Sequence, residues 1–297
     1  MRVFMTGAAG FIGVATTREL IANGHQVVGL ARSDANVAAL EAAGAAVHRG
    51  SLEDFDSLRA GAADADGVIH LAFIHDFSKF AENGQIDKRA IEAMGDVLEG
   101  TDKPFIVTSG TALIAPPGAV VTEEMRRDAG THVPRVSEKT GLAYASRGVR
   151  AMAIRLPQVH GADGKAGLIT YLLEGARRKG AAAYVGDGSA RWAAGHRLDV
   201  AHLYRLALEK GAADSIYHAV GEEGVPMRQI IEVLGRALNV PVVSIKQEEA
   251  GDYYGPLAMF ADLDMPASSA LTQKWLGWKP TQIELIANIG QPGYFTS

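Results

Sequence analysis

The chain has 297 residues, and its contents of 47% hydrophobic and 21% charged residues are those of an ordinary globular protein. That length allows one large domain, or one domain with a smaller companion. The formal net charge of −5 argues against a nucleic-acid or anionic-membrane surface, and the lack of cysteine excludes disulfides, thiolate metal ligands and cysteine nucleophiles.

The first predicted elements are a buried strand, from the apolar run Val3-Phe4-Met5, and an amphipathic helix that ends at Asn23-Gly24. The turn between them holds three glycines. Gly7 permits a tight turn, Gly10 lets the backbone approach a pyrophosphate, and Gly13 lets helix and strand pack closely. The anion would lie at the helix N-terminus, where unpaired N–H groups and the helix dipole favour negative charge. The turn therefore predicts a dinucleotide site formed by Thr6, Gly7, Ala9, Gly10, Phe11, Ile12 and Gly13.

The second predicted strand, Gln26–Leu30, indicates which dinucleotide is bound. In NAD-binding proteins an acidic side chain about 20 residues past the glycines accepts a hydrogen bond from the ribose. Here Ala31 takes that place, and Arg32 and Ser33 follow. A guanidinium can donate two parallel hydrogen bonds to a 2′-phosphate, and a serine adds a hydroxyl donor. We favour NADP over NAD on this ground. One alternative is that Arg32 is simply a solvated arginine at the end of a strand. The other is NAD, since Asp34 lies nearby, although it falls past the strand.

Strand-like and helical patterns then alternate along the chain. Strands are predicted at residues 45–48, 68–72, 105–108, 152–156 and 216–220, and helices at 54–62, 88–98, 138–146 and 200–210. This alternation predicts an α/β fold with a Rossmann-type, doubly wound parallel sheet. Ligands of such sheets bind beyond the carboxyl ends of the strands. We therefore expect one crevice to be lined by Gly7, Arg32, Ser51-Leu52, Ala72-Phe73 and Ser109-Gly110.

The alternation breaks after Leu156, where glycine and proline become frequent. We predict a nucleotide-binding domain at residues 1–157, which the helix near 200–210 and the strand near 216–220 also join. Residues 158–297 would form mainly a smaller substrate-binding lobe, capped by Trp275 and Trp278 near its end.

These segments together resemble the extended short-chain dehydrogenase/reductase superfamily in its epimerase/dehydratase branch. The resemblance covers nearly the whole chain, and its ordered pieces are Thr6-Gly7-x-x-Gly10-x-x-Gly13, Gly50-Ser51-Leu52-Glu53-Asp54, His70-Leu71-Ala72, Thr108-Ser109-Gly110-Thr111, Arg147-Gly148-Val149, Arg155-Leu156-Pro157-x-x-His160-Gly161 and His196-Arg197-Leu198-Asp199-Val200-Ala201.

The resemblance implies further cofactor contacts. Ser51 and Leu52 would border the adenine, and Leu71, Ala72 and Phe73 would line the cofactor channel. Pro157 and Val159 would lie near the nicotinamide, whereas Asp199 would have a structural role at a helix start.

One departure from the superfamily concerns its Tyr-x-x-x-Lys pair, in which the lysine lowers the tyrosine pKa and the tyrosine moves the substrate's proton. No tyrosine in this chain has a lysine four residues later, and Tyr144 has Gly148 at that offset. Counting back from Glu138 places the motif at Gly130–Pro134 or Thr131–Arg135, and neither frame holds a tyrosine. The chain thus resembles the atypical members of the superfamily, many of unknown function.

Ser109 is the residue that the resemblance places against a substrate carbonyl or hydroxyl. Its hydroxyl can polarise a carbonyl as hydride arrives, and Thr111 can share or replace that role. Capping of a turn by both hydroxyls is the alternative.

The sequence does not identify the residue that exchanges a proton with the substrate in place of the missing tyrosine. His75, in the loop over the nicotinamide, is our first candidate, because histidine titrates near neutral pH. Arg135 would take over the ribose-binding task of the lost lysine. Further candidates, each with a structural role as its alternative, are His132, His160, His196 and Tyr253-Tyr254.

We therefore predict an NADP(H)-dependent oxidoreductase that acts on a small organic carbonyl or alcohol, with Ser109 polarising the substrate. The alternatives are a nucleotide-sugar epimerase or dehydratase and a non-catalytic NADP-binding sensor. We expect a monomer or homodimer with a small-molecule substrate, without metal, nucleic acid or membrane as partners. The early first strand leaves no room for a signal peptide, so a cytoplasmic location is expected.

Overall fold

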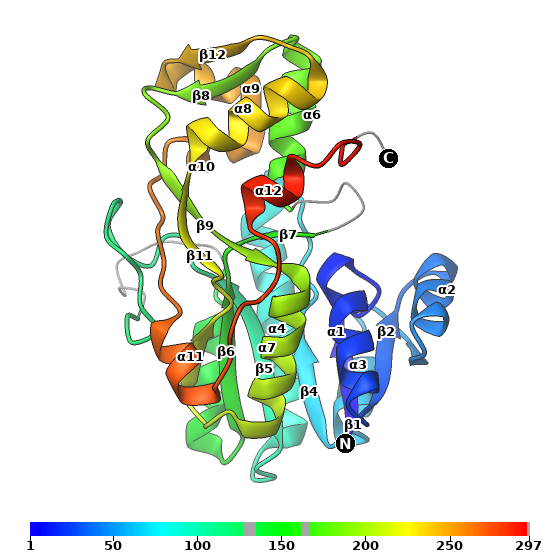
Figure 1. The fold of residues 1–297 in the computed structure, drawn as a ribbon. Helices are drawn as coiled ribbons and strands as arrows, with labels where there is room; N and C mark the ends of the chain where they lie inside the picture. The colour runs from blue at the N-terminus through cyan, green and yellow to red at the C-terminus, as the bar shows by residue number, and fades with distance from the viewer. Residues whose placement is uncertain (127–134, 162–166, 296–297) are drawn as a thin grey trace.

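The centre of the molecule is a sheet of seven parallel strands in the order β10-β6-β5-β4-β1-β2-β3 (Figure 1). This computed structural model describes residues 1–126, 135–161 and 167–295. The strands are β1 (Arg2–Thr6), β2 (Gln26–Ala31), β3 (Ala46–Arg49), β4 (Gly67–His70), β5 (Pro104–Gly110), β6 (Arg150–Leu156) and β10 (Ser215–His218). The predicted Rossmann-type doubly wound sheet is confirmed.

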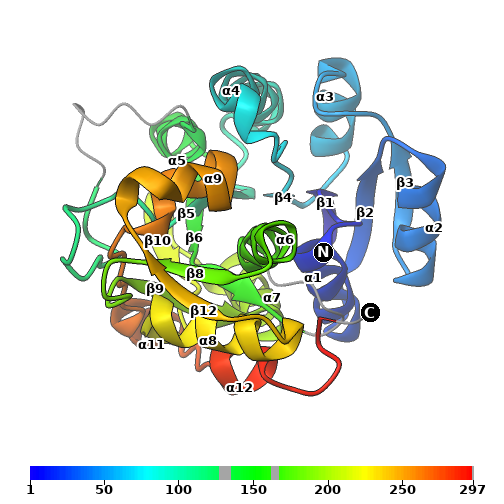
Figure 2. The same cartoon turned by 90° about the horizontal axis from the view of Figure 1, so that it is seen from above.

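Helices cover both faces of this sheet because successive strand residues point to opposite sides. Val3 and Met5 of β1 join one buried cluster, packed by α1 (Phe11–Ala22), α2 (Asp34–Ala42) and α7 (Arg197–Lys210). Phe4, between them, joins the other cluster, packed by α3 (Phe55–Ala63), α4 (Phe80–Leu98) and α5 (Ser137–Leu142). Figure 2 shows these two helix layers on either side of the sheet.

The second part of the molecule lies beyond the carboxyl ends of the central strands (Figure 1). It has a three-stranded sheet of β11 (Glu222–Pro226), β9 (Arg191–His196) and β7 (Gln158–His160), and a two-stranded sheet of β12 (Val242–Ile245) and β8 (Ala182–Val185). A separate buried cluster is formed there with α6 (Ile169–Lys179), α8 (Met227–Leu238), α9 (Ala250–Tyr254), α10 (Ala258–Ala261) and α12 (Leu285–Ile289). These elements lie within residues 158–297, for which a substrate-binding lobe is predicted, and we call this part the lobe.

The tryptophans near the end of the chain do not cap that lobe. Trp278 is fully buried in the cluster of the central sheet beside Tyr204 and Tyr217, and its Nε1 donates to the Asp199 carbonyl at 2.9 Å. Trp275 belongs to α11 (Ala270–Leu276), and its ring packs edge-on against Tyr217 of β10. The last segment therefore returns to the first part of the molecule.

Two helices differ from their predicted extents. α4 begins at Phe80 rather than near residue 88, because buried contacts of Asn83, Gly84 and Ile86 hold a turn whose residues have low helix propensity. The helix predicted to reach Ser146 is α-helical only to Leu142 and continues as a 3₁₀ helix, which Gly148 ends with a φ of 74°.

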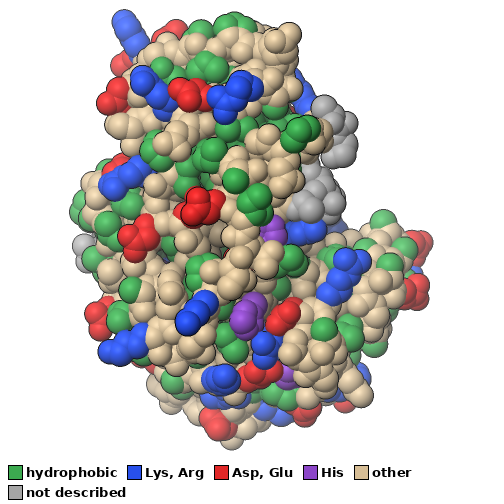
Figure 3. All heavy atoms as spheres, in the orientation of Figure 1, with side chains coloured by type: hydrophobic (Ala, Val, Ile, Leu, Met, Phe, Trp, Pro, Cys, Tyr) green, Lys and Arg blue, Asp and Glu red, His purple; other side chains and the backbone are tan. Residues whose placement is uncertain are grey.

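Charged side chains of both signs are interspersed over the face of the molecule in Figure 3. In the described ranges, no helix is both long enough and apolar enough to cross a lipid bilayer.

Candidate active site

The glycine-rich turn after β1 has the geometry that its three glycines predict. Gly7 has a φ of +71°, and a Cβ there would lie 2.7 Å from the Ala72 nitrogen. A Cβ on Gly13 would lie 2.0 Å from the Gly7 carbonyl oxygen, so only glycine lets α1 pack this close to the turn. Gly10 is the N-cap of α1 and brings no side-chain acceptor, which leaves the first amides of the helix to a ligand.

This turn opens into a cavity of about 870 Å³ that runs along the carboxyl edge of the sheet and beneath the lobe. That volume is within the range of cofactor and ligand sites. The cavity brings together eighteen of the twenty predicted site residues: Gly7, Ala9, Gly10, Phe11, Ile12, Gly13, Arg32, Ser51, Leu52, Leu71, Ala72, Phe73, His75, Ser109, Thr111, Arg135, Pro157 and Val159.

The two remaining predicted residues lie outside the cavity lining. Thr6 is fully buried, and its hydroxyl bonds His70 Nδ1 at 2.8 Å and accepts from the Ala72 amide at 3.2 Å. Ser33 caps α2, where its hydroxyl accepts from the Asn36 amide at 3.3 Å. Both side chains support the cavity wall rather than forming it.

Arg32 stands exposed at one end of the cavity, and within the described residues it has no hydrogen-bond or ion-pair partner. The nearby acid, Asp34, is held by Arg49 at 2.6 Å. Asn36 also lines this end, although the sequence analysis did not single it out. The guanidinium is therefore available to an anionic ligand, whereas Asp34 does not line the cavity.

Ser109 lies at the other end of the cavity, at the carboxyl end of β5. It is buried, and its hydroxyl makes no hydrogen bond to the part of the chain that the structure describes. The Thr111 hydroxyl has only a long contact of 3.5 Å to the Leu156 carbonyl. His75 lines the same end, and burial together with the charge of Arg135 lowers its pKa. The Ser109 hydroxyl and the neutral imidazole of His75 thus both line the end of the cavity beside β5.

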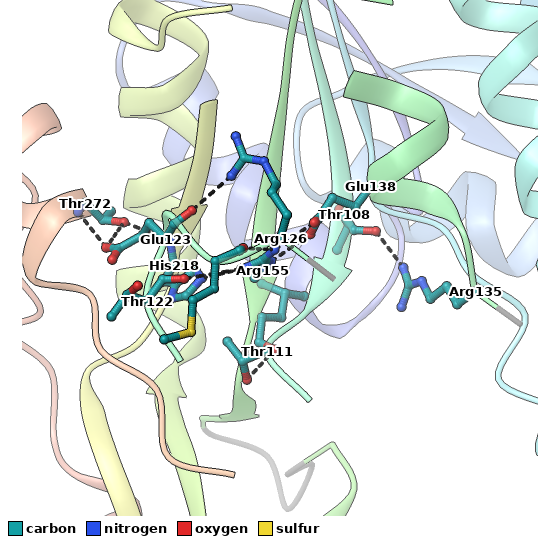
Figure 4. Close-up of polar contacts among 12 residues, drawn as sticks. Thr108, Thr111, Thr122, Glu123, Arg126, Arg135, Glu138, Arg155, His218 and Thr272 are labelled. Carbon is teal, nitrogen blue, oxygen red and sulfur yellow. Dashed lines mark hydrogen bonds and ion pairs between the residues drawn. The ribbon is translucent and has the colours of Figure 1, made fainter. Parts of the chain in front are cut away.

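Arg135 reaches the same part of the cavity from the residues before α5. Its Nη2 donates to the Thr108 carbonyl at 2.8 Å, as Figure 4 shows, and its Nε donates to Ser137 Oγ at 3.0 Å. Its guanidinium lies 4.2 Å from the centre of the Phe73 ring, a cation–π contact. The side chain is fixed on three sides beside the channel expected to hold the nicotinamide.

The other candidates from the sequence do not meet at the cavity. His160 and His196 pack edge to face at 5.3 Å, outside its lining, and His160 Nδ1 bonds Asn288 at 2.9 Å. Tyr253 and Tyr254 belong to α9, where Tyr254 lies in the buried cluster of the lobe and Tyr253 packs against it, and neither lines the cavity. His132 and the frame Gly130–Pro134 lie outside the described residues.

Tyr144 is also remote, because its hydroxyl donates to Asp96 of α4 at 2.7 Å and the residue does not line the cavity. Burial and the neighbouring carboxylate raise the pKa of this phenol.

The side of the cavity that faces the lobe is not predicted by any sequence motif. Its residues come from loops, the start of α4, α6, β9 and α10, and most are large and apolar: Ile74, Phe80, Leu113, Leu168, Tyr171, Trp192, Phe260 and Met265. In a sequence such residues look like ordinary core, and nothing local marks them as neighbours. Tyr171 adds a phenol to this wall.

A glycine-rich turn on the first strand of a parallel sheet, opening into a long cavity along the carboxyl edge, defines a Rossmann-type dinucleotide-binding protein. Residues 3–220 match the model of the NAD dependent epimerase/dehydratase family. An uncharacterized protein of Schizosaccharomyces pombe is 48% identical over 297 residues, covering 99% of this chain and 100% of the relative.

Two further comparisons are more distant. The decarboxylating sterol-4-alpha-carboxylate 3-dehydrogenase of Dictyostelium discoideum is 28% identical over 251 residues, covering 76% of this chain and 73% of the relative. The fold is also similar to a crystal structure of Thermus thermophilus UDP-glucose 4-epimerase in complex with NAD, with a TM-score of 0.76 at 19% identity and coverage of 100% of this chain and 99% of that one.

The chain belongs to the NAD dependent epimerase/dehydratase family, and it is an NAD(P)-dependent enzyme of the extended short-chain dehydrogenase/reductase superfamily. The resemblance drawn from the sequence motifs is therefore confirmed.

Proposed function

We propose that this enzyme is an NADP(H)-dependent oxidoreductase that transfers hydride to or from a small, largely apolar carbonyl compound or alcohol. The observation that carries the proposal is a cavity with Arg32 at one end and the Ser109 hydroxyl at the other, neither of which has a hydrogen-bond partner among the residues that the structure describes. The first group suits a 2′-phosphate and the second suits a reacting oxygen.

The residues present fit this cofactor. The turn at Gly7 and Gly13 has no room for side chains, and the start of α1 offers unpaired amides to a diphosphate. Arg32 and Asn36 would hold the phosphorylated adenosine, Leu71 to Phe73 would border the channel, and Arg135 would meet the nicotinamide ribose. Bound NADPH supplies the hydride.

The chain's own part in the chemistry is to hold and polarise the substrate. The Ser109 hydroxyl donates to the substrate oxygen and stabilises the negative charge that grows on it. Thr111 is the second hydroxyl at this end. The lowered pKa of His75 keeps its imidazole neutral near pH 7, so it can accept the proton of an alcohol in the oxidative direction.

The wall of the lobe favours an apolar carbonyl over a nucleotide sugar. A sugar nucleotide carries a diphosphate, which proteins bind with Arg, Lys or backbone amides. Among the described residues that line the cavity, the arginines are Arg32 and Arg135, and the lobe contributes none. Trp192, Phe260 and Met265 instead offer it apolar surface.

The test is turnover of NADPH with a panel of aliphatic and aromatic aldehydes and ketones. Stoichiometric oxidation with apolar members is expected. NAD retained through purification, with interconversion of a nucleotide sugar, would replace this proposal by the epimerase. Cofactor binding without turnover, together with a co-purifying protein, would replace it by the sensor.

A further inference from the structure

A buried chain of hydrogen bonds connects the glycine-rich turn to Arg135. Beginning at the cavity wall, the Ala72 amide donates to Thr6 Oγ1 at 3.2 Å, and Thr6 Oγ1 lies 2.8 Å from His70 Nδ1. His70 Nε2 lies 3.0 Å from Asp87 Oδ1. Ser137 Oγ donates to Asp87 Oδ2 at 2.5 Å, and Arg135 Nε donates to Ser137 Oγ.

Two donors converge on Asp87. An ionised carboxylate can only accept hydrogen bonds, so His70 Nε2 carries a proton and donates to Asp87 Oδ1. The Ser137 hydroxyl donates to the other carboxylate oxygen. Asp87 is 1% exposed, and an ionised carboxylate with two donors is the one acceptor-only member of the chain.

Asp87 also supplies the negative charge nearest to Arg135 within this network. Burial alone would raise the pKa of Asp87, but the hydrogen bond from His70, the charge of Arg135 and the hydrogen bond from Ser137 lower it overall. The carboxylate therefore stays ionised and attracts the guanidinium through the single intervening Ser137 hydroxyl. Arg135 itself lines the cavity, whereas Asp87, His70 and Ser137 lie behind its wall.

We propose that Asp87 is a positioning residue that holds Arg135, through Ser137, against the nicotinamide-ribose half of the cofactor, and that also anchors the cavity wall at Ala72 through His70 and Thr6. The inference rests on the proposed function, because it takes that half of the cavity to hold the nicotinamide. It extends that function by assigning a role to four residues behind the cavity wall, namely Thr6, His70, Asp87 and Ser137.

Asp87→Asn is the sharpest variant. The asparagine amide presents N–H to one of the two donors, so that one hydrogen bond must reverse or break, and the charge facing Arg135 is lost. Ser137→Ala removes only the link to Arg135 and serves as the test if Asp87→Asn does not fold. Asp199→Asn is the matched control, since Asp199 is a buried aspartate that accepts from the Thr281 and Gln282 amides away from the cavity lining.

The measurements are affinities for NADPH and for 2′,5′-ADP, which lacks the nicotinamide half, together with turnover. Both Asp87→Asn and Ser137→Ala are expected to lower turnover by about 10- to 100-fold, since small misplacements of an orienting group have effects of that size. They should weaken NADPH about tenfold and leave 2′,5′-ADP affinity unchanged. Asp199→Asn should keep wild-type values for all three.

A double-mutant cycle with Arg135→Met separates positioning from a general structural role. If Ser137 acts through Arg135, Ser137→Ala should cost little more in the Arg135→Met background. Equal losses for NADPH and 2′,5′-ADP, additive effects in the cycle, or wild-type turnover in both variants would each overturn the inference.

A wild-type protein that prefers NADH and 5′-ADP would overturn the proposed cofactor alone, and the same comparison with those ligands would still decide the role of Asp87. If the wild type bound none of these nucleotides, the proposed function and this inference would both be wrong.

Discussion

Arg32 and Ser109 lie at opposite ends of one cavity, and each side chain leaves its functional group without a protein partner in the described residues. Folded proteins usually satisfy buried polar groups internally. The buried Ser109 hydroxyl is therefore available to a polar ligand atom, and the exposed Arg32 guanidinium at the other end is free to meet an anion.

Replacing Arg32 with alanine tests the adenosine end. The variant should bind NADPH at least about tenfold more weakly, because a charge-assisted contact to the 2′-phosphate is lost, while NADH binding changes little. Isothermal titration with both cofactors measures this, and Arg49→Ala, which removes the exposed partner of Asp34, is a nearby control. Equal losses for the two cofactors would refute the assignment to NADP.

Replacing Ser109 with alanine tests the reacting end. Turnover should fall by about 100-fold, the usual size for loss of one oxyanion donor, with cofactor affinity unchanged. Steady-state kinetics on an accepted carbonyl, with the Kd of NADPH measured separately, gives both numbers. Thr111→Val should have the smaller effect, and unchanged turnover in Ser109→Ala would exclude Ser109 from the reaction.

The sequence predicted which residues meet along the sheet side of the cavity, because the carboxyl ends of parallel strands must lie at one edge. It did not predict the lobe side. Trp192 and Phe260 come from β9 and α10, and only the tertiary packing brings them to Leu113. The hydrogen-bond network behind Arg135 could not be predicted from the sequence either, since Asp87 looks like one more charged residue of the amphipathic α4.

At the scale of elements, β6 and α5 are joined by a buried ion pair. Arg155 is fully buried and donates through Nε and Nη2 to both carboxylate oxygens of Glu138, each at 2.7 Å. Its Nη1 and Nη2 also donate to the Thr122 and Met125 carbonyls, and His218 lies 3.2 Å away (Figure 4). Arg155 thus connects strand β6 and helix α5 to the segment that follows β5.

Glu138→Gln should lower the free energy of unfolding by about 3 to 5 kcal/mol, because it leaves a buried guanidinium without its counter-charge. Urea unfolding followed by circular dichroism measures the change. Asp56→Asn, which breaks the exposed Arg59–Asp56 pair, should cost no more than about 1 kcal/mol. Similar losses in the two variants would show that Arg155 is compensated by its carbonyl acceptors alone.

The observed bounds of α4 and α5 differ from those predicted by the local sequence pattern, because contacts outside the pattern decide where each helix begins and ends. α4 starts earlier than its helical pattern because Asn83 donates from its side chain to the Asp76 carbonyl at 2.9 Å, a tertiary contact that offsets poor propensity. The α5 region shortens to a 3₁₀ turn before Gly148, which its helix-like composition does not reveal.

For the whole molecule, two buried histidines couple stability to pH. Burial lowers the pKa of His160 to about 4, and burial with the charge of Arg155 lowers that of His218 to about 3. The unfolded chain, with ordinary values, binds these protons more tightly. Stability should therefore be constant above about pH 6.5 and fall progressively below it, as acid favours the unfolded chain.

By about pH 5 each histidine should have cost about 2 kcal/mol relative to neutral pH. Urea unfolding at a series of pH values measures the slope, and His160→Gln should make it shallower in this range. A slope identical to that of the wild type would exclude His160 from the acid sensitivity.

The path of the chain between the two parts has a consequence for any attempt to separate them. After β6 the backbone enters the lobe, returns as α7 and β10, leaves again through β11, and comes back with α11 (Figure 1). A fragment cut after Pro157 would expose the free edge of β6 and the apolar patch that Val200, Leu203 and Tyr204 cover. Such a fragment should aggregate rather than fold as an autonomous nucleotide-binding domain. The lobe therefore cannot be exchanged for that of another protein by joining two sequences at this single point.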